Sequence, residues 1–154
     1  MRHGKSDWGS GSLRDFDRPL NERGKRDVVK IGKEIKNRSL TPDLIISSPA
    51  ERAKKTAEGV AEFSGYGKDI EWKESFYFGY YKEILETLNN IDDNAGIVMI
   101  VGHNPTWSSL TERLSGKYFD MKTANVCILE FEGSWNELSE NYCKFITYIS
   151  PKKL

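Results

Sequence analysis

Hydrophobic and polar positions in the first half of the chain switch between a helical period and short apolar runs. Residues 21–37 predict an amphipathic helix, because apolar side chains recur three and four positions apart among charged ones and Asn21 can cap the first turn. The run 43–47 is short and mostly apolar, which is typical of a buried strand. A second amphipathic helix is predicted from Pro49, a residue suited to the first helical turn, to about residue 63.

The second half of the chain continues this alternation. It predicts an edge strand at 69–73, a helix at 82–91, a central strand at 96–101 and a further helix at 105–114. Two final strands, at 125–131 and 142–149, can pair in antiparallel fashion. The run 96–101 is apolar on both faces, as in the middle of a parallel sheet. Strands that alternate with helices indicate an α/β fold, here a three-layer sandwich around a mostly parallel sheet. In such sheets, ligands bind beyond the carboxyl ends of the strands.

Two stretches allow more than one interpretation. Residues 5–20 are rich in Gly, Ser and Asp and predict a loop, and loops of that length are usually functional or disordered. Their aromatic residues, Trp8 and Phe16, favour a packed loop. The aromatic run 76–81 is either a patch that covers the core or one wall of a substrate cleft.

Composition narrows the class of protein. A chain of 154 residues is long enough for one well-buried core and too short for two, so we expect a single domain over residues 1–154. Lys and Arg number 23, as do Asp and Glu, and this zero net charge gives no reason to expect a nucleic acid or an anionic membrane as partner. No apolar run approaches the roughly 18 residues of a membrane span, so we expect a cytoplasmic protein. Cys127 and Cys143 lie inside apolar stretches, either as buried free thiols or facing each other across neighbouring strands.

The two histidines of the chain both lie in short motifs beside apolar or strand-like runs. His3 belongs to Met-Arg-His-Gly at the start, and His103 belongs to Val-Gly-His-Asn-Pro directly after the predicted central strand. Imidazole suits nucleophilic and proton-transfer work near neutral pH, because its unperturbed pKa is about 6.5. A phosphoryl group in transfer spreads negative charge over three oxygens and needs a ring of donors. Arg2, Arg52 and His103 could form that ring around His3.

These motifs resemble those of the histidine phosphatase superfamily, whose members share the phosphoglycerate mutase-like fold. The resemblance is carried by four runs in the expected order: Arg-His-Gly-Lys-Ser at 2–6, Asp-Arg-Pro-Leu-Asn-x-Arg-Gly at 17–24, Ser-Ser-Pro-x-x-Arg-Ala-x-x-Thr-Ala at 47–57 and Val-Gly-His-Asn-Pro at 101–105. The short chain and the Asp-Arg-Pro-Leu run look most like the SixA-type phosphohistidine phosphatases.

The resemblance implies roles for particular residues. In this family the histidine of Arg-His-Gly attacks phosphorus and becomes a phosphohistidine that water hydrolyses, and this role falls on His3. The family's phosphate-binding residues fall on Arg2, Arg52 and His103. Arg18 could reach the phosphate, or it could simply pair with the nearby carboxylate of Asp15 or Asp17.

A proton donor for the leaving group is the least certain member of the site. In many members of the superfamily a carboxylate after the third strand does this work, and the matching residue is Glu74; a solvated loop glutamate is the alternative interpretation. A phosphoramidate such as phosphohistidine releases a better leaving group than an ordinary phosphate ester. Two histidines without a carboxylate cluster are a poor metal ligand set, so we expect no metal and no cofactor.

The sequence departs from the family at its start. Members normally place Arg-His-Gly at the end of an apolar first strand near the centre of the sheet, and this sequence begins at the motif. That strand is therefore absent from these residues, and a terminus is poorly ordered unless something ties it down. Either upstream residues are missing, or the sheet closes around a gap or borrows a strand from another copy of the chain. The hypothesis that we favour is a truncated phosphatase whose His3 is poorly placed and which is inactive.

The leading hypothesis is a cofactor-independent phosphatase that acts through phospho-His3 on phosphohistidine in proteins or on small phosphomonoesters. One alternative is a phosphomutase, which needs a second phosphate site and a secure acid. Another is a non-catalytic module that binds phosphate or a phosphoprotein. The sequence makes no prediction about the oligomeric state.

Overall fold

Helices and strands alternate along the chain in the predicted order. The computed structural model describes residues 1–8 and 11–154. Its helices α1 to α5 span Glu22–Asn37, Glu51–Ser64, Ser75–Phe78, Tyr81–Asn89 and Thr106–Ser115, and its strands β1 to β5 span Leu44–Ser47, Glu71–Trp72, Val98–Val101, Val126–Glu130 and Lys144–Ile149. Three short 3-10 helices, η1 to η3, span Asp15–Asp17, Trp135–Glu137 and Pro151–Lys153.

Local signals in the sequence account for the helix ends. The side chain of Asn21 accepts a hydrogen bond from the backbone N–H of Gly24 and so caps α1, as predicted. Helices α2 and α5 both end at a glycine in the left-handed region, Gly65 with φ of 85° and Gly116 with φ of 74°. Glycine takes this conformation without the steric cost that other residues meet.

Strand β1 lies in the middle of a parallel three-stranded sheet, between β2 and β3. Its register with β3 runs from Leu44 opposite Val98 to Ser47 opposite Val101. Strands β4 and β5 pair in antiparallel fashion, which confirms the predicted pairing. Because β1 and β3 are parallel, the segments that follow Ser47 and Val101 emerge at the same edge of the sheet.

Residues 1–3 lie between the two sheets and bind to both. On one side Arg2 forms a parallel bridge with Gly102. The Gly102 N–H donates to the Met1 carbonyl, and the Gly102 carbonyl accepts from the His3 N–H, each over 3.1 Å. On the other side the Arg2 N–H donates to the Asn125 carbonyl over 3.0 Å, and the Ala124 N–H donates to the His3 carbonyl over 2.9 Å. The prediction of a poorly placed His3 is therefore wrong, because backbone hydrogen bonds on both sides hold the motif.

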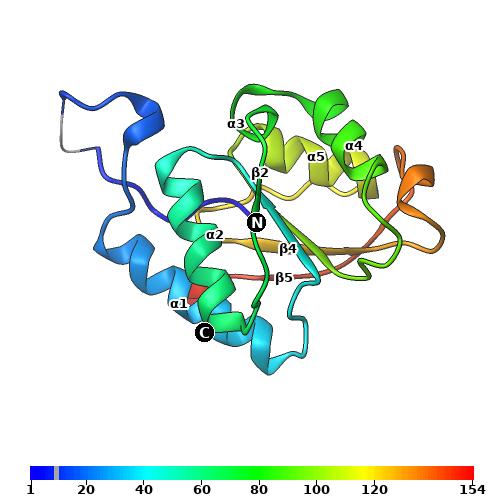
Figure 1. Cartoon of the computed structure of the whole chain (residues 1–154), viewed down its shortest axis with the longest axis horizontal. Coiled ribbons are helices and arrows are strands. Elements are labelled where there is room, and N and C mark those ends of the chain that lie inside the picture. Colours follow the sequence, from blue (N-terminus) through cyan, green and yellow to red (C-terminus); the bar gives the residue numbers. More distant parts are fainter. Residues whose placement is uncertain (9–10) are drawn as a thin grey trace.

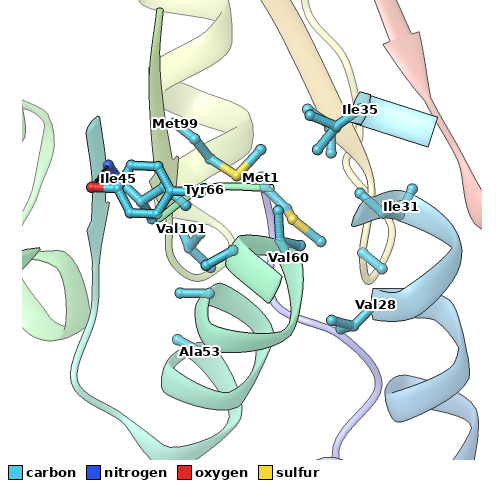
Figure 2. Packing of buried hydrophobic residues seen from close by; sticks show 14 of the residues in the cluster. Met1, Val28, Ile31, Ile35, Ile45, Ala53, Val60, Tyr66, Met99 and Val101 are labelled. Carbon is cyan, nitrogen blue, oxygen red and sulfur yellow. Dashed lines mark hydrogen bonds between the residues drawn. The ribbon is translucent and has the colours of Figure 1, made fainter. Parts of the chain in front are cut away.

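Helices α1 and α2 lie on one face of the sheet and α4 and α5 on the other, which gives the predicted three layers (Figure 1). Side chains that alternate along the strands pack against these helices. One face packs against α1 and α2, and Figure 2 shows this cluster, which includes Val28, Ile31, Ile35, Ile45, Ala53, Val60, Met99 and Val101. The other face packs against α4 and α5, and its buried residues include Ile46, Phe76, Ile84, Leu88, Trp107, Leu110 and Leu114.

The two cysteines and the helix lengths answer two further predictions from the sequence. Cys127 and Cys143 are free thiols; Cys143 is buried and Cys127 lies opposite Tyr148 in the β4–β5 pair. Over residues 1–8 and 11–154, no helix combines the length and the apolar character that a membrane crossing requires.

Candidate active site

The two histidines meet at the carboxyl edge of the parallel sheet. His103 follows β3, and its Nε2 lies 2.8 Å from the hydroxyl of Ser48, which follows β1. The rings of His3 and His103 lie with their centroids 5.1 Å apart. The fold thus brings together two residues that are a hundred positions apart in the sequence, as the strand-end rule predicts.

His3 is held in the form that a nucleophile requires. Its Nδ1 lies 2.7 Å from the carbonyl oxygen of Gly4, and a carbonyl only accepts, so Nδ1 carries the proton and the lone pair is on Nε2. Burial lowers the pKa of His3 to about 4; the Gly4 hydrogen bond opposes this shift, and the charges of Arg52, Arg2 and Arg18 add to it. The imidazole is therefore neutral at neutral pH.

Thr56 of helix α2 holds the Arg-His-Gly motif in place. The hydroxyl of Thr56 accepts from the Gly4 N–H over 3.0 Å and donates to the Arg52 carbonyl over 2.7 Å. Thr56 is fully buried, so this pair of hydrogen bonds is shielded from water. One side chain thereby ties the residue after His3 to the helix turn that carries Arg52.

The two predicted arginines have donors that no protein group uses. Arg52 is only 5% exposed although it lies in the first turn of α2, and both of its terminal nitrogens donate to Asp15. Arg2 donates from one terminal nitrogen to the Met121 carbonyl over 3.0 Å. Among the described residues, the buried side-chain atoms without a partner include Nε of Arg2, Nε of Arg52 and Nδ1 of His103. Most buried polar groups of proteins have a partner, so these three groups are available to a bound anion.

Asp15 joins three residues of the site, whereas the sequence named it only as a possible partner of Arg18. Its carboxylate accepts from Arg18 over 3.1 Å, from Arg52 over 3.1 Å and from the Tyr77 hydroxyl over 2.8 Å. Burial alone would raise its pKa, but the Tyr77 hydrogen bond and the charges of Arg52 and Arg18 outweigh this and bring the pKa to about 2. The interpretation that Arg18 pairs with Asp15 is confirmed; Asp17 pairs with Arg14 instead.

The aromatic run contributes to both the core and the site. The ring of Phe76 is buried and packs edge-on against Trp107 at 5.3 Å. The ring of Tyr77 packs edge-on against His103 at 5.4 Å and against Phe16 at 5.1 Å. The core interpretation therefore holds for Phe76, whereas the ring of Tyr77 lies beside His103, one of the candidate site residues.

Glu74 is not brought into contact with the other candidate residues. It precedes α3, its backbone carbonyl accepts from the N–H of Tyr77 over 2.9 Å, and its side chain is exposed. Among the hydrogen bonds and ion pairs of the described residues, none joins its carboxylate to His3, His103 or the arginines. The same part of the chain has no group of three or more His, Cys, Asp or Glu side chains that could hold a metal ion.

Burial of the two histidines predicts a pH-dependent stability. The pKa of His3 is about 4 and that of His103 is about 3, lowered first by burial and then by neighbouring positive groups, against about 6.5 in an unfolded chain. Between pH 6.5 and about 4 the unfolded chain therefore binds protons that the folded chain does not, and the folded state loses stability as the pH falls. We expect the free energy of unfolding in urea to drop from pH 7 to pH 5 by roughly 2 kcal/mol for each histidine.

A variant with one histidine fewer provides the control for this prediction. His3→Asn keeps a donor for the Gly4 carbonyl and removes one of the two titrations. The loss of stability between pH 7 and pH 5 should then be about half as large. An equal loss in the variant and the parent would show that the histidines do not cause it.

The identity of the family follows from the sequence matches as well as the geometry. Residues 1–77 match the family model of the histidine phosphatase superfamily, branch 1. An uncharacterised chloroplastic protein of Arabidopsis thaliana is 33% identical over 147 residues, which are 89% of this chain and 67% of that protein. The chain belongs to the histidine phosphatase superfamily.

Within that superfamily the chain is similar to the SixA proteins. A protein of Agrobacterium tumefaciens assigned to the phosphohistidine phosphatase SixA has a TM-score of 0.84 and 27% identity, over 98% of this chain and 95% of that one. The protein histidine phosphatase SixA complexed with tungstate has a TM-score of 0.86 at 20% identity, over 99% and 96% of the two chains. The phosphoglycerate mutase-like α/β fold that the motifs imply is confirmed.

Proposed function

We propose that this chain is a phosphatase that works through a phosphohistidine intermediate on His3 and acts on phosphohistidine in proteins, with small phosphomonoesters as weaker substrates. The observation that carries the proposal is the state of His3. It is neutral, its proton is committed to the Gly4 carbonyl, and its remaining nitrogen is free to attack phosphorus. The guanidinium charges of Arg2, Arg18 and Arg52 all act on this imidazole.

The arrangement supports a two-step transfer. Nε2 of His3 attacks phosphorus in line with the leaving atom, the bond from phosphorus to the substrate breaks, and its electron pair stays on the leaving atom. Water then attacks phospho-His3, a new P–O bond forms, and the electron pair of the P–N bond returns to Nε2. One water proton stays on the released phosphate and the other passes to solvent.

The donors that have no protein partner are suited to the charge that develops on the phosphoryl oxygens. Nε of Arg2 and Nε of Arg52 carry fixed N–H groups inside a site where water is scarce, which strengthens their interaction with an anion. His103 can donate from Nδ1 when its Nε2 accepts the Ser48 hydroxyl proton, since that hydroxyl already accepts from the Ala50 N–H. These unpartnered donors support the ring that we propose around the phosphoryl group.

Protein phosphohistidine is the substrate class that the site favours. Glu74, the candidate proton donor, is exposed and has no contact with the histidines, and a phosphoramidate depends less on such a donor than an alkyl ester does. The similarity to SixA proteins, one of them described as a protein histidine phosphatase that binds the phosphate analogue tungstate, supports the same class.

The proposal is tested by trapping the intermediate. The protein is mixed with a radiolabelled phosphohistidine peptide and quenched within seconds, and the expected result is a label on the protein that is labile in acid, stable in base and mapped to the peptide that contains His3. Binding of the phosphopeptide without any label or turnover would instead establish a non-catalytic phosphoprotein-binding module. Transfer of the label to an acceptor phosphate compound in place of water would establish a mutase.

A further inference from the structure

The hydroxyl of Tyr77 lies at the edge of the site, and its proton is already used in a hydrogen bond to Asp15. It donates to the Asp15 carboxylate over 2.8 Å, and this hydrogen bond lies in an exposed environment. The Asp15 side chain is 52% exposed, whereas His3 is 6% exposed. The edge of the site at Asp15 and Tyr77 is therefore open to solvent, whereas His3 is enclosed.

The direction of attack places the leaving group on this same side. In-line displacement by His3 puts the leaving atom opposite the nucleophile, toward the opening of the site. The Tyr77 ring also packs against His103, whose ring lies next to that of His3, so Tyr77 borders this same side of the site.

The hydrogen-bond partners of Asp15 fix which role the Tyr77 oxygen can play. The carboxylate receives Arg18, Arg52 and Tyr77, and an ionised carboxylate only accepts. The phenol proton therefore points at Asp15, and the lone pairs of the Tyr77 oxygen face away from it. Burial, the Asp15 hydrogen bond and the Asp15 charge raise the pKa of Tyr77, so the phenol does not ionise near neutral pH. Toward a substrate this oxygen is an acceptor.

We propose that Tyr77, oriented by Asp15, determines specificity for substrates whose leaving group carries an N–H, and that the substrate class is phosphorylated imidazole in its protonated form. This inference rests on the proposed function. The ring N–H distant from phosphorus donates to the Tyr77 oxygen. When His3 forms its bond to phosphorus, the electron pair of the broken P–N bond stays on the ring nitrogen, and the ring leaves as neutral imidazole that keeps its own proton.

This arrangement removes the need for a separate acid. An alkoxide leaving group brings no N–H to the Tyr77 oxygen and requires a proton that this oxygen, with its hydrogen bonded to Asp15, does not supply. Glu74 makes no hydrogen bond or ion pair with His3 or His103 among the described residues, which agrees with a reaction in which the substrate carries its own proton.

The test compares two substrates in the same variants. The kcat/KM of the full chain is measured with a phosphohistidine peptide and with p-nitrophenyl phosphate, whose leaving group has no N–H. Tyr77→Phe is expected to lower the ratio of the two values at least about tenfold, because a hydrogen bond to a charged group is lost for the first substrate only. Tyr80→Phe, an exposed tyrosine three positions along the chain, is expected to leave the ratio unchanged within twofold.

A double-mutant cycle tests the part played by Asp15. Asp15→Asn should lower the ratio in the parent and have no further effect on it in Tyr77→Phe, because both changes act through one oxygen. Asp17→Asn removes the same charge from the same 3-10 helix, and it should leave the ratio unchanged because Asp17 pairs with Arg14.

The outcomes separate this inference from the proposed function. If the parent forms phospho-His3 but Tyr77→Phe lowers both kcat/KM values equally, Tyr77 only supports the fold of the site and the inference is wrong while the proposed function stands. If the parent forms no phospho-His3 and hydrolyses neither substrate, the proposed function fails and the inference fails with it.

Discussion

His3→Asn is expected to lower kcat for phosphohistidine hydrolysis by at least about 10³-fold while binding of tungstate is kept. The asparagine amide N–H can replace Nδ1 as the donor to the Gly4 carbonyl, so the local backbone has no reason to move. What the variant lacks is the second ring nitrogen, the one that attacks phosphorus. Loss of a nucleophile removes the whole two-step path, and residual rates then come from binding alone.

Three measurements make this prediction decisive. Kinetics with a phosphohistidine peptide give kcat, titration with tungstate gives the affinity of the donor ring, and urea unfolding at pH 7 gives the stability. His3→Gln is the matched control, because its amide is placed one bond further out and does not restore Nδ1 donation to Gly4. Turnover by His3→Asn within tenfold of the parent would mean that another group attacks phosphorus.

The sequence located the groups that are fixed by local motifs. His3, Arg2, Arg52 and His103 each sit in a run whose residue types match one chemical task. The runs of Arg52 and His103 each follow a predicted strand, and because parallel strands present their carboxyl ends at one edge, these two runs were expected to meet. The structure places the rings of the two histidines 5.1 Å apart.

The remaining contacts depend on packing that no local pattern encodes. The hydrogen bond between Tyr77 and Asp15 joins residues 62 positions apart. Neither the pattern of the loop 5–20 nor that of the aromatic run 76–81 predicts that these two side chains meet. The aromatic run did signal a cleft wall as one interpretation, and the pairing of Arg18 with Asp15 was among those expected. The contact that joins Tyr77 to Asp15 and Arg18 is evident only in the folded structure.

Backbone hydrogen bonds hold the first residues of the chain in place, although a terminus is usually poorly ordered. The expectation of a poorly placed His3 treated the terminus as a free end. Its backbone instead lies between Gly102 on one side and the pair Ala124 and Asn125 on the other, and Met1 is 5% exposed. Backbone groups that pair with both neighbours hold a short segment as a longer strand would be held.

Gly102→Ala is expected to lower the free energy of unfolding by about 3 kcal/mol or more and to remove activity with it. A Cβ at this position would lie 2.3 to 2.4 Å from three ring atoms of Trp107, which is 2% exposed and packed against Phe76. Because the ring is rigid and buried, the ring or the backbone must shift, and overpacking of this kind costs about 1–3 kcal/mol or more.

The same shift reaches the site, because Gly102 precedes His103 and exchanges backbone hydrogen bonds with Met1 and His3. Urea unfolding and kcat/KM are measured on Gly102→Ala and on Gly67→Ala, whose added Cβ would meet no atom within 4 Å. The control should change stability by no more than about 0.5 kcal/mol and leave kcat/KM unaltered. Equal stability of the two variants would show that the contact with Trp107 does not limit this position. A stable but inactive Gly102→Ala would show instead that the glycine is required for the placement of the histidines alone.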